Sequence, residues 1–148
     1  MTAIVSGYGL VVQIVASRTF PGGVTITSFA DDADPFDLPS LQIADKAMGG
    51  NGDLIGWQKP QPIVVSLSVI PNTQSERLLS VLFETNRVGR GKLAVFDLIT
   101  MTGIYQDGRT ITLTNGFLTD GMPGLSVSSA GRLKTKTFSF AFENEANT

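Results

Sequence analysis

Four aspartates close together in the first third of the sequence are the side chains best suited to chemistry. Asp31, Asp32, Asp34 and Asp37 lie within seven residues of one another. Clustered carboxylates are what a hard cation such as Ca²⁺ requires. Their spacing differs from that of an EF-hand loop, however, and a proline–phenylalanine pair stands where a further ligand would be needed. We therefore predict no metal site here and no cofactor elsewhere in the chain.

Other catalytic arrangements are poorly supported. The chain has no histidine and no cysteine, so it lacks the commonest general base, any thiolate nucleophile and every cysteine zinc site. A glycosidase needs two placed carboxylates, for which Asp53 near Trp57 is the one candidate neighbourhood. The glycine-containing segments 7–9 and 89–92 lack the spacing of nucleotide-binding motifs. We predict that the protein is not an enzyme.

The composition is typical of a globular chain. With 148 residues, 42% hydrophobic and 16% charged, the sequence fits one domain over residues 1–148. Its apolar runs are far shorter than the ~20 residues of a membrane helix, and the N-terminus lacks the basic region of a signal peptide. A net charge of −2 gives no general affinity for nucleic acid. We expect a protein made in the cytoplasm.

Short β-branched runs separated by glycine and proline predict a mainly β chain with one helix. Thr73 and Glu76 match a capping box, which predicts a helix over about 73–88, with Gly89 as its C-cap. A hairpin turn is expected at Asp107–Gly108, and the polar tail after residue 142 is expected to fray. The other expected strands and turns are strands at 10–16, 24–29, 62–70, 93–104, 110–119 and 133–142, and a turn at 20–23.

A long segment from about residue 30 to residue 60 shows neither the hydrophobic period of a helix nor the alternation of a strand. Its glycines and prolines argue against a long regular element, and connections of this length are usually functional or disordered. Its large apolar side chains would form a sticky surface if all were exposed. The segment either folds back on its own domain or docks on another molecule. These side chains are Phe36, Leu38, Leu41, Ile43, Met48, Leu54, Ile55 and Trp57.

The near-neutral net charge is the sum of two opposed segments. Residues 31–53 contain six acids and one base, whereas residues 87–136 contain seven bases and three acids. These charges either cancel on the surface of one monomer or form a head-to-tail contact between copies. The bases that would form such a counter-surface are Arg87, Arg90, Lys92, Arg109, Arg132, Lys134 and Lys136.

Rows of small hydroxyl side chains occupy strand faces where lysine and glutamate are usual. One interpretation is the β-propensity of threonine. The other is a shared surface or channel in which long charged side chains are unwelcome. The rows are Thr25 and Thr27, Ser66 and Ser68, Thr110, Thr112 and Thr114, and Thr135, Thr137 and Ser139.

Two stretches of the long segment resemble a known family. SFADDADPFD at residues 28–37 and IADKAMGGNGDLI at residues 43–55 are similar to the tail tube proteins of contractile-tailed bacteriophages. The order of elements over nearly the whole chain is also similar, although residues 28–57 are the most specific part. The resemblance implies an antiparallel β-sandwich or barrel-like subunit with one helix and a long loop at about 30–60.

The same resemblance implies a structural virion protein. Such subunits form stacked, usually hexameric rings, whose continuous β-barrel conducts DNA during genome ejection from the virion tail. The implied partners are further copies and the sheath, tape-measure, baseplate and neck proteins, with DNA passing without specific binding and no membrane contact. Alternatives are another tail component, such as a terminator or adaptor, a tube of a phage-like secretion system or pyocin, and a solitary β-sandwich binding module.

The expected interaction residues follow from these arguments. The long segment would reach the neighbouring subunit or ring, and its acids would meet the basic segment of the next copy. Smooth hydroxyl rows, expected at Thr110, Thr112, Thr114, Thr135, Thr137 and Ser139, would line the lumen. The residues expected between subunits are Asp31, Asp32, Asp34, Phe36, Asp37, Leu41, Ile43, Met48, Asp53, Leu54 and Trp57.

Overall fold

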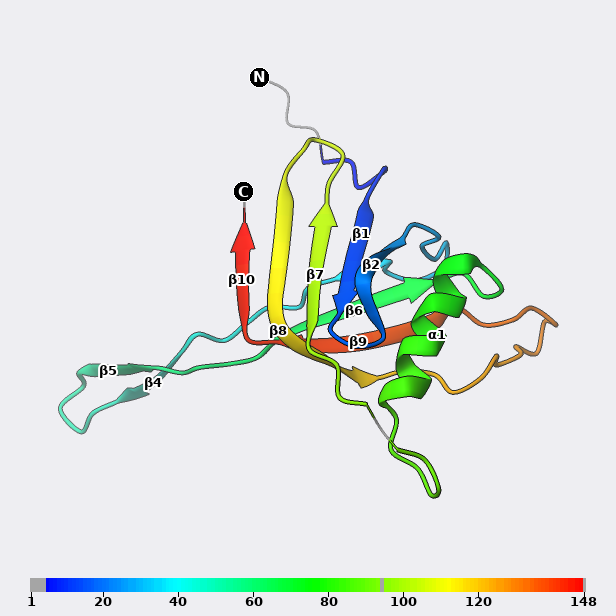
Figure 1. The fold of residues 1–148 in the computed structure, drawn as a ribbon. Helices are drawn as coiled ribbons and strands as arrows, with labels where there is room; N and C mark the ends of the chain where they lie inside the picture. The colour runs from blue at the N-terminus through cyan, green and yellow to red at the C-terminus, as the bar shows by residue number, and fades with distance from the viewer. Residues whose placement is uncertain (1–4, 94, 148) are drawn as a thin grey trace.

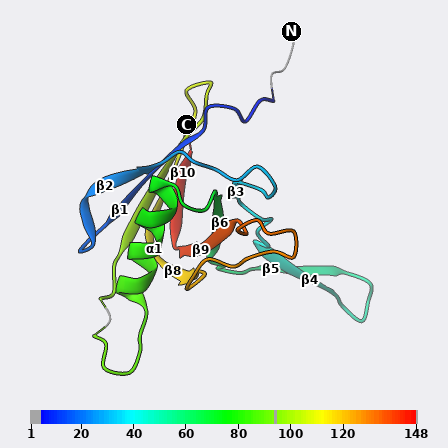
Figure 2. The ribbon, with the colours of Figure 1, turned by 90° about the vertical axis from the view of Figure 1, so that its right-hand side faces the viewer.

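The computed structural model describes residues 5–93 and 95–147, which form ten strands and one helix (Figures 1 and 2). No helix in these ranges is long and apolar enough to cross a membrane. The elements in chain order are β1 (Val11–Ala16), β2 (Phe20–Ile26), β3 (Phe36–Asp37), β4 (Ala44–Met48), β5 (Leu54–Gln58), β6 (Ile63–Val69), α1 (Gln74–Asn86), β7 (Ile99–Ile104), β8 (Thr110–Asp120), β9 (Lys136–Phe142) and β10 (Asn144–Asn147).

One antiparallel sheet contains all strands except β4 and β5. Its order is β2-β1-β7-β8-β9-β6-β3, and β10 also pairs with β8. β8 is long enough to serve two parts of the sheet, because its first half pairs with β7 and β10 and its end pairs with β9. Figure 1 shows the result: β1, β7 and β10 run upright, whereas β6 and β9 cross below them. The predicted mainly β, antiparallel fold with one helix is confirmed.

The bend of β8 requires a glycine at its corner. A Cβ atom at Gly116 would lie 2.1 Å from the Phe142 ring, so any other residue would force the two strands apart. The preceding residue, Asn115, has a positive φ of 55°. The path of described strands stays open between β2 and β3, so the monomer by itself forms no closed barrel.

The hydrophobic core lies between the two parts of the sheet and the helix. Alternate residues of β6 and β9 point into it, as the sequence predicted for Phe138, Phe140 and Phe142. Leu79 and Leu82 of α1 close it from the side. The remaining buried members are Val12, Ile14, Ala16, Ile26, Val65, Leu67, Val69, Ile99, Met101, Ile111 and Leu113.

The helix begins as predicted but ends differently. The Thr73 hydroxyl accepts a hydrogen bond from the Glu76 N–H at 3.3 Å, which satisfies one of the free N–H groups of the first turn. The Glu76 carboxylate, however, pairs with the Lys136 ammonium 2.8 Å away instead of completing a capping box. The predicted C-cap at Gly89 is also wrong, because α1 ends at Asn86 and Arg87 has an extended backbone.

The first hairpin turns earlier than its glycines suggested. The predicted turn at 20–23 lies inside β2, and the chain reverses over residues 17–19. The Asp97 carboxylate accepts hydrogen bonds from the backbone N–H groups of Arg18 and Thr19 and from the Thr19 hydroxyl. The turn is therefore held by a residue 79 positions away in the sequence, which local turn chemistry does not reveal.

Three further expectations differ from the structure. The segment 30–60 does contain regular structure, namely β3 and the β4–β5 hairpin. The tail after Phe142 is not frayed over 144–147 but pairs with β8 as β10. The strands expected at 93–104 and 133–142 start later, at Ile99 and Lys136, and residue 94 lies outside the described residues.

Candidate assembly surfaces

The β4–β5 hairpin, residues 44–58, is called the arm below because it projects away from the body of the molecule (Figures 1 and 2). Within the described part of the chain its two strands pair with each other and with no other strand. The turn at its tip is closed by a hydrogen bond from the Gly49 N–H to the Asp53 carbonyl at 2.8 Å. Gly52 adopts the positive φ, 85°, that this turn requires.

The arm exposes apolar side chains on both faces. Ile55 and Trp57 lie on one face, where they are 51% and 47% exposed. An ion pair on the same face joins Asp45 and Lys59 at 3.6 Å.

On the opposite face, the cross-strand pair Met48 and Leu54 is 65% and 72% exposed. A two-stranded hairpin without a packed face is only marginally stable in water. The arm therefore has the properties of a segment that is covered by another molecule.

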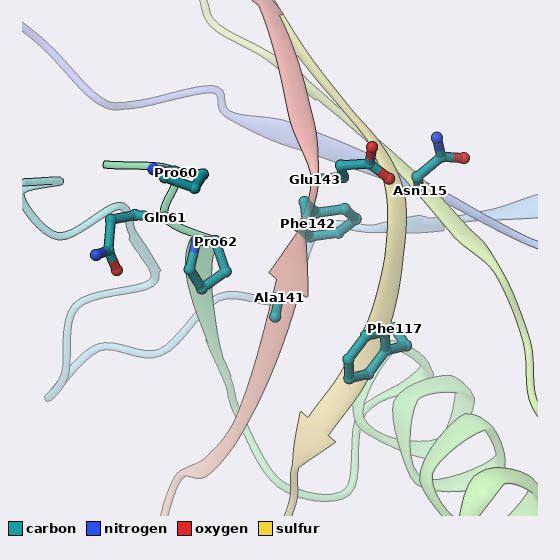
Figure 3. Close-up of a pocket in the computed structure, with 8 residues that line it drawn as sticks. All are labelled: Pro60, Gln61, Pro62, Asn115, Phe117, Ala141, Phe142 and Glu143. Carbon is teal, nitrogen blue, oxygen red and sulfur yellow. The ribbon is translucent and has the colours of Figure 1, made fainter. Parts of the chain in front are cut away.

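An apolar pocket of about 440 Å³ opens beside the base of the arm (Figure 3). Pro60 and Pro62, in the chain that leaves β5, form one wall. The outward side chains of Phe117 on β8 and Ala141 on β9 form the other. Its remaining lining residues, most of them polar, are Gln61, Asn115, Phe142 and Glu143.

The outward side of Phe117 is part of a larger apolar surface. Phe117 is 41% exposed, and its ring centroid lies 5.5 Å from that of Phe96. Val64 of β6 lies next to Ala141 across the sheet and is 39% exposed. Sequence reasoning missed this surface. The Asn115–Gly116 pair inside a strand pattern was the signal for a bend that carries Phe117 to the outer face.

The outward face of β1, β2, β7 and the first half of β8 carries no charged side chain. The strand registers align Thr25, Gln13, Thr102 and Thr112 in one row across the four strands. The row places a predicted lumen residue, Thr112, beside three uncharged neighbours from other strands. Thr110 and Thr114 lie on the same face of β8, next to it along the chain.

The other predicted lumen residues lie elsewhere. Thr137 and Ser139 of β9 face Ser68 and Ser66 of β6, with hydroxyl oxygens 3.0 and 3.3 Å apart. Thr135 precedes β9, and its hydroxyl donates a hydrogen bond to the carboxylate of an aspartate before β3, Asp32. The two groups of hydroxyls therefore belong to different parts of the sheet.

Two of the clustered aspartates are paired within the chain. Arg132 lies 2.8 Å from the Asp31 carboxylate and 3.5 Å from that of Asp32. The hydrogen bond from Arg132 holds the pKa of Asp31 below its ordinary value. Asp34 and Asp37 are exposed, and no ion pair within the described residues involves them. No group of three acids able to hold a metal occurs in the described ranges.

Several predicted counter-surface bases are also paired within the chain. Lys92 and Arg87 lie 3.1 and 3.3 Å from the Glu84 carboxylate, and their hydrogen bonds lower the pKa of Glu84. Lys136 is 3% exposed and pairs with Glu76, so its proposed place on an exposed basic surface is wrong.

Phe36 and Leu41, expected in the projecting segment, lie before the arm in the chain. Phe36 belongs to β3, where its ring meets that of Tyr105 edge to face with centroids 6.5 Å apart. Leu41 is 43% exposed, and Ile43, directly before β4, is 69% exposed. Arg90 and Lys134 are exposed and have no ion pair within the described residues, and Arg109 follows the turn before β8.

Solved structures of contractile injection systems contain chains with a similar fold. A chain of the extended-state sheath/tube terminator of an extracellular contractile injection system (PVC) matches with a TM-score of 0.57 and 13% identity, covering 99% of this chain and 98% of its own. A chain of the tube-terminating cap of the anti-feeding prophage (AFP) matches with a TM-score of 0.54 and 13% identity, covering 100% of this chain and 93% of its own. A chain of the AFP baseplate matches with a TM-score of 0.56 and 13% identity, covering 100% of this chain and 97% of its own.

Sequence comparison places the chain in a family. No curated protein matches it. A family model described as tail fiber protein gp32 matches residues 3–146. Together with the fold matches, this confirms the resemblance to proteins related to contractile tails. Because the model spans nearly the whole sequence, the chain belongs to the tail fiber protein gp32 family.

Proposed function

We propose that the protein is a structural subunit of a contractile tail, which assembles into rings that stack as the inner tube of a virion. The observation that carries the proposal is the uncharged face across β1, β2, β7 and β8. Lysine or arginine on such a face would bind phosphates, whereas threonine and glutamine let a polyanion pass. The face thus suits a lumen that conducts DNA during ejection without binding it.

Ring closure would use the free edges of the same part of the sheet. β2 and β10 each have one neighbouring strand within the described residues, so each leaves a row of backbone N–H and C=O groups unpaired. Pairing β2 of one copy with β10 of the next would continue the sheet from subunit to subunit. Six copies joined in this way would give the closed barrel that the monomer lacks.

The arm would join neighbouring copies or rings. Its exposed apolar side chains need a covering surface, and its length takes it beyond the body of its own subunit (Figure 2). Asp34 and Asp37, which have no ion pair within the described residues, would meet bases such as Arg90 and Lys134 of another copy. Sheath, tape-measure, baseplate and neck proteins would contact the assembled tube.

A tube terminator is the second candidate. The chains from the PVC terminator and the AFP cap match the present chain over nearly its full length. A terminator would form one ring that ends the tube, whereas a tube subunit would form rings that stack without limit. A tube of a phage-like secretion system or pyocin would share the tube's assembly and differ in what passes through it.

Negative-stain electron microscopy of the concentrated, purified protein tests these candidates. Hollow filaments of stacked rings are expected of a tube subunit, and single rings of uniform diameter would favour the terminator. Size-exclusion chromatography over a range of concentrations checks the same point in solution. A species that stays monomeric at all concentrations would overturn both candidates and favour a solitary β-sandwich binding module.

A further inference from the structure

We infer that the pocket between Pro62 and Phe117 is the seat for the tip of the arm of a second copy. The inference deepens the proposed function, on which it rests, by naming where the arm binds. Three observations carry it: the chemistry of the pocket, the chemistry of the arm tip, and the geometry that keeps the two apart within one chain.

The pocket and the tip have matching apolar surfaces. The pocket is lined by the rings of Pro60, Pro62 and Phe117 and by the Ala141 methyl group. The tip presents Met48 and Leu54 as one cross-strand pair, and both side chains are exposed. Bringing these groups together removes apolar surface from water on both sides. Methionine also adapts well to an irregular cavity.

The charges beside the two apolar surfaces are opposite. Lys46 lies two residues before Met48 in β4, so its side chain is on the same face of the arm as Met48 and Leu54. Glu143 lines the pocket at the corner between β9 and β10 (Figure 3). Within the described residues neither side chain takes part in an ion pair. A docked tip would place the ammonium group near the carboxylate, which fixes the orientation of the arm.

Geometry excludes the chain's own arm as the occupant. Pro60 and Pro62 follow the last residue of β5, Gln58, by two and four positions, so the pocket wall begins just after the base of the arm. From Leu54 to Gln58 the strand extends by about 13 Å, and Figure 1 shows the arm pointing away from β8 and β9. The tip that fills a given pocket must therefore come from another molecule. Tip and pocket are different surfaces, so in the proposed tube the contact would be heterologous and, repeated from copy to copy, would yield rings or filaments.

Disulfide trapping tests the contact, because the natural chain has no cysteine. The variants Leu54→Cys and Ala141→Cys are purified separately, mixed at assembling concentrations and oxidised. A disulfide-linked dimer is expected in the mixture at about ten times the level in either variant alone. Leu54→Cys mixed with Val127→Cys is the matched control, because Val127 is exposed in the loop between β8 and β9 and does not line the pocket. Equal cross-linking in the two mixtures would overturn the inference.

Charge reversal gives an independent readout on the full chain. Lys46→Glu and Glu143→Lys should each raise the concentration needed for assembly about fivefold, and the double variant should restore it. Electron micrographs of the same samples separate the two proposals. Assembled rings with neither cross-linking nor charge rescue would refute the pocket as the seat and leave the tube function standing. Absence of any assembly in the natural protein would refute both.

Discussion

The Lys136 ammonium lies 2.8 Å from the Glu76 carboxylate, and both side chains are almost fully buried. Ser80 bridges the pair, because its hydroxyl donates to the carboxylate and accepts a hydrogen bond from the ammonium group. The pair joins the first turns of α1 to the start of β9, so it fixes the helix on the sheet.

Removal of one partner of this pair should destabilise the fold strongly. We predict that Lys136→Met lowers the free energy of unfolding by about 3–5 kcal/mol, since it leaves the buried Glu76 carboxylate without an opposite charge. The double variant Lys136→Met with Glu76→Leu should recover most of the loss. Urea unfolding monitored by circular dichroism measures both. A single variant as stable as the natural protein would show that the pair contributes nothing to folding.

The Asp97 carboxylate should make stability depend on pH. Burial raises its pKa, but hydrogen bonds from Thr19, Asn86 and the backbone N–H groups of Arg18 and Thr19 outweigh this and hold the pKa below the ordinary 3.8. Because the folded pKa is lowered, the stabilisation is present above about pH 4 and is lost as the pH falls through the folded value.

We therefore predict that Asp97→Asn destabilises the protein by roughly 1–3 kcal/mol at pH 7 and by less below pH 4. Unfolding in urea at a series of pH values measures the difference between the two proteins. Asp120→Asn, at an exposed site at the end of β8, is the control and should leave stability unchanged. A difference for Asp97→Asn that stays constant from pH 7 to pH 3 would contradict a lowered pKa of Asp97 in the folded protein.

Introduced lysines should turn the proposed lumen into a DNA-binding surface. We predict that tubes of Thr102→Lys or Thr112→Lys protein retain DNA and release it with rising salt, because each lysine adds a phosphate contact. Tubes of the natural protein should retain none. Thr137→Lys, on the other part of the sheet, serves as the control. Stronger DNA retention by the Thr137 variant than by the Thr112 variant would contradict the proposal that the face carrying Thr112 lines the lumen.

The acids before the arm should support assembly without supporting the fold. We predict that reversing the charge of both Asp34 and Asp37 to lysine raises the concentration required for assembly severalfold, since opposite charges would no longer meet between copies. The melting temperature should stay within about 2 °C, as neither side chain has an ion pair in the described residues. Light scattering follows assembly. Unchanged polymerisation of the double variant would contradict a role of Asp34 and Asp37 in contacts between copies.

The sequence alone predicted those features that depend on neighbouring residues. The Thr73 cap fixed the start of α1, because its hydroxyl reaches an N–H group three residues away. The alternation from Phe138 to Phe142 determined which face of β9 is buried, since successive strand side chains point to opposite faces. The apolar side chains between 36 and 57 indicated a segment that either folds back on its own domain or docks on another molecule.

Only the tertiary structure decided features that depend on distant residues. The turn between β1 and β2 is held by Asp97. Lys136 is buried and pairs with Glu76 instead of lying on the predicted basic surface. The corner of β8 depends on Phe142, which excludes any side chain at Gly116. Such contacts join positions that the sequence separates widely, so local propensity carries no record of them. They determine which hydroxyl rows share a face and where the pocket proposed for the arm lies.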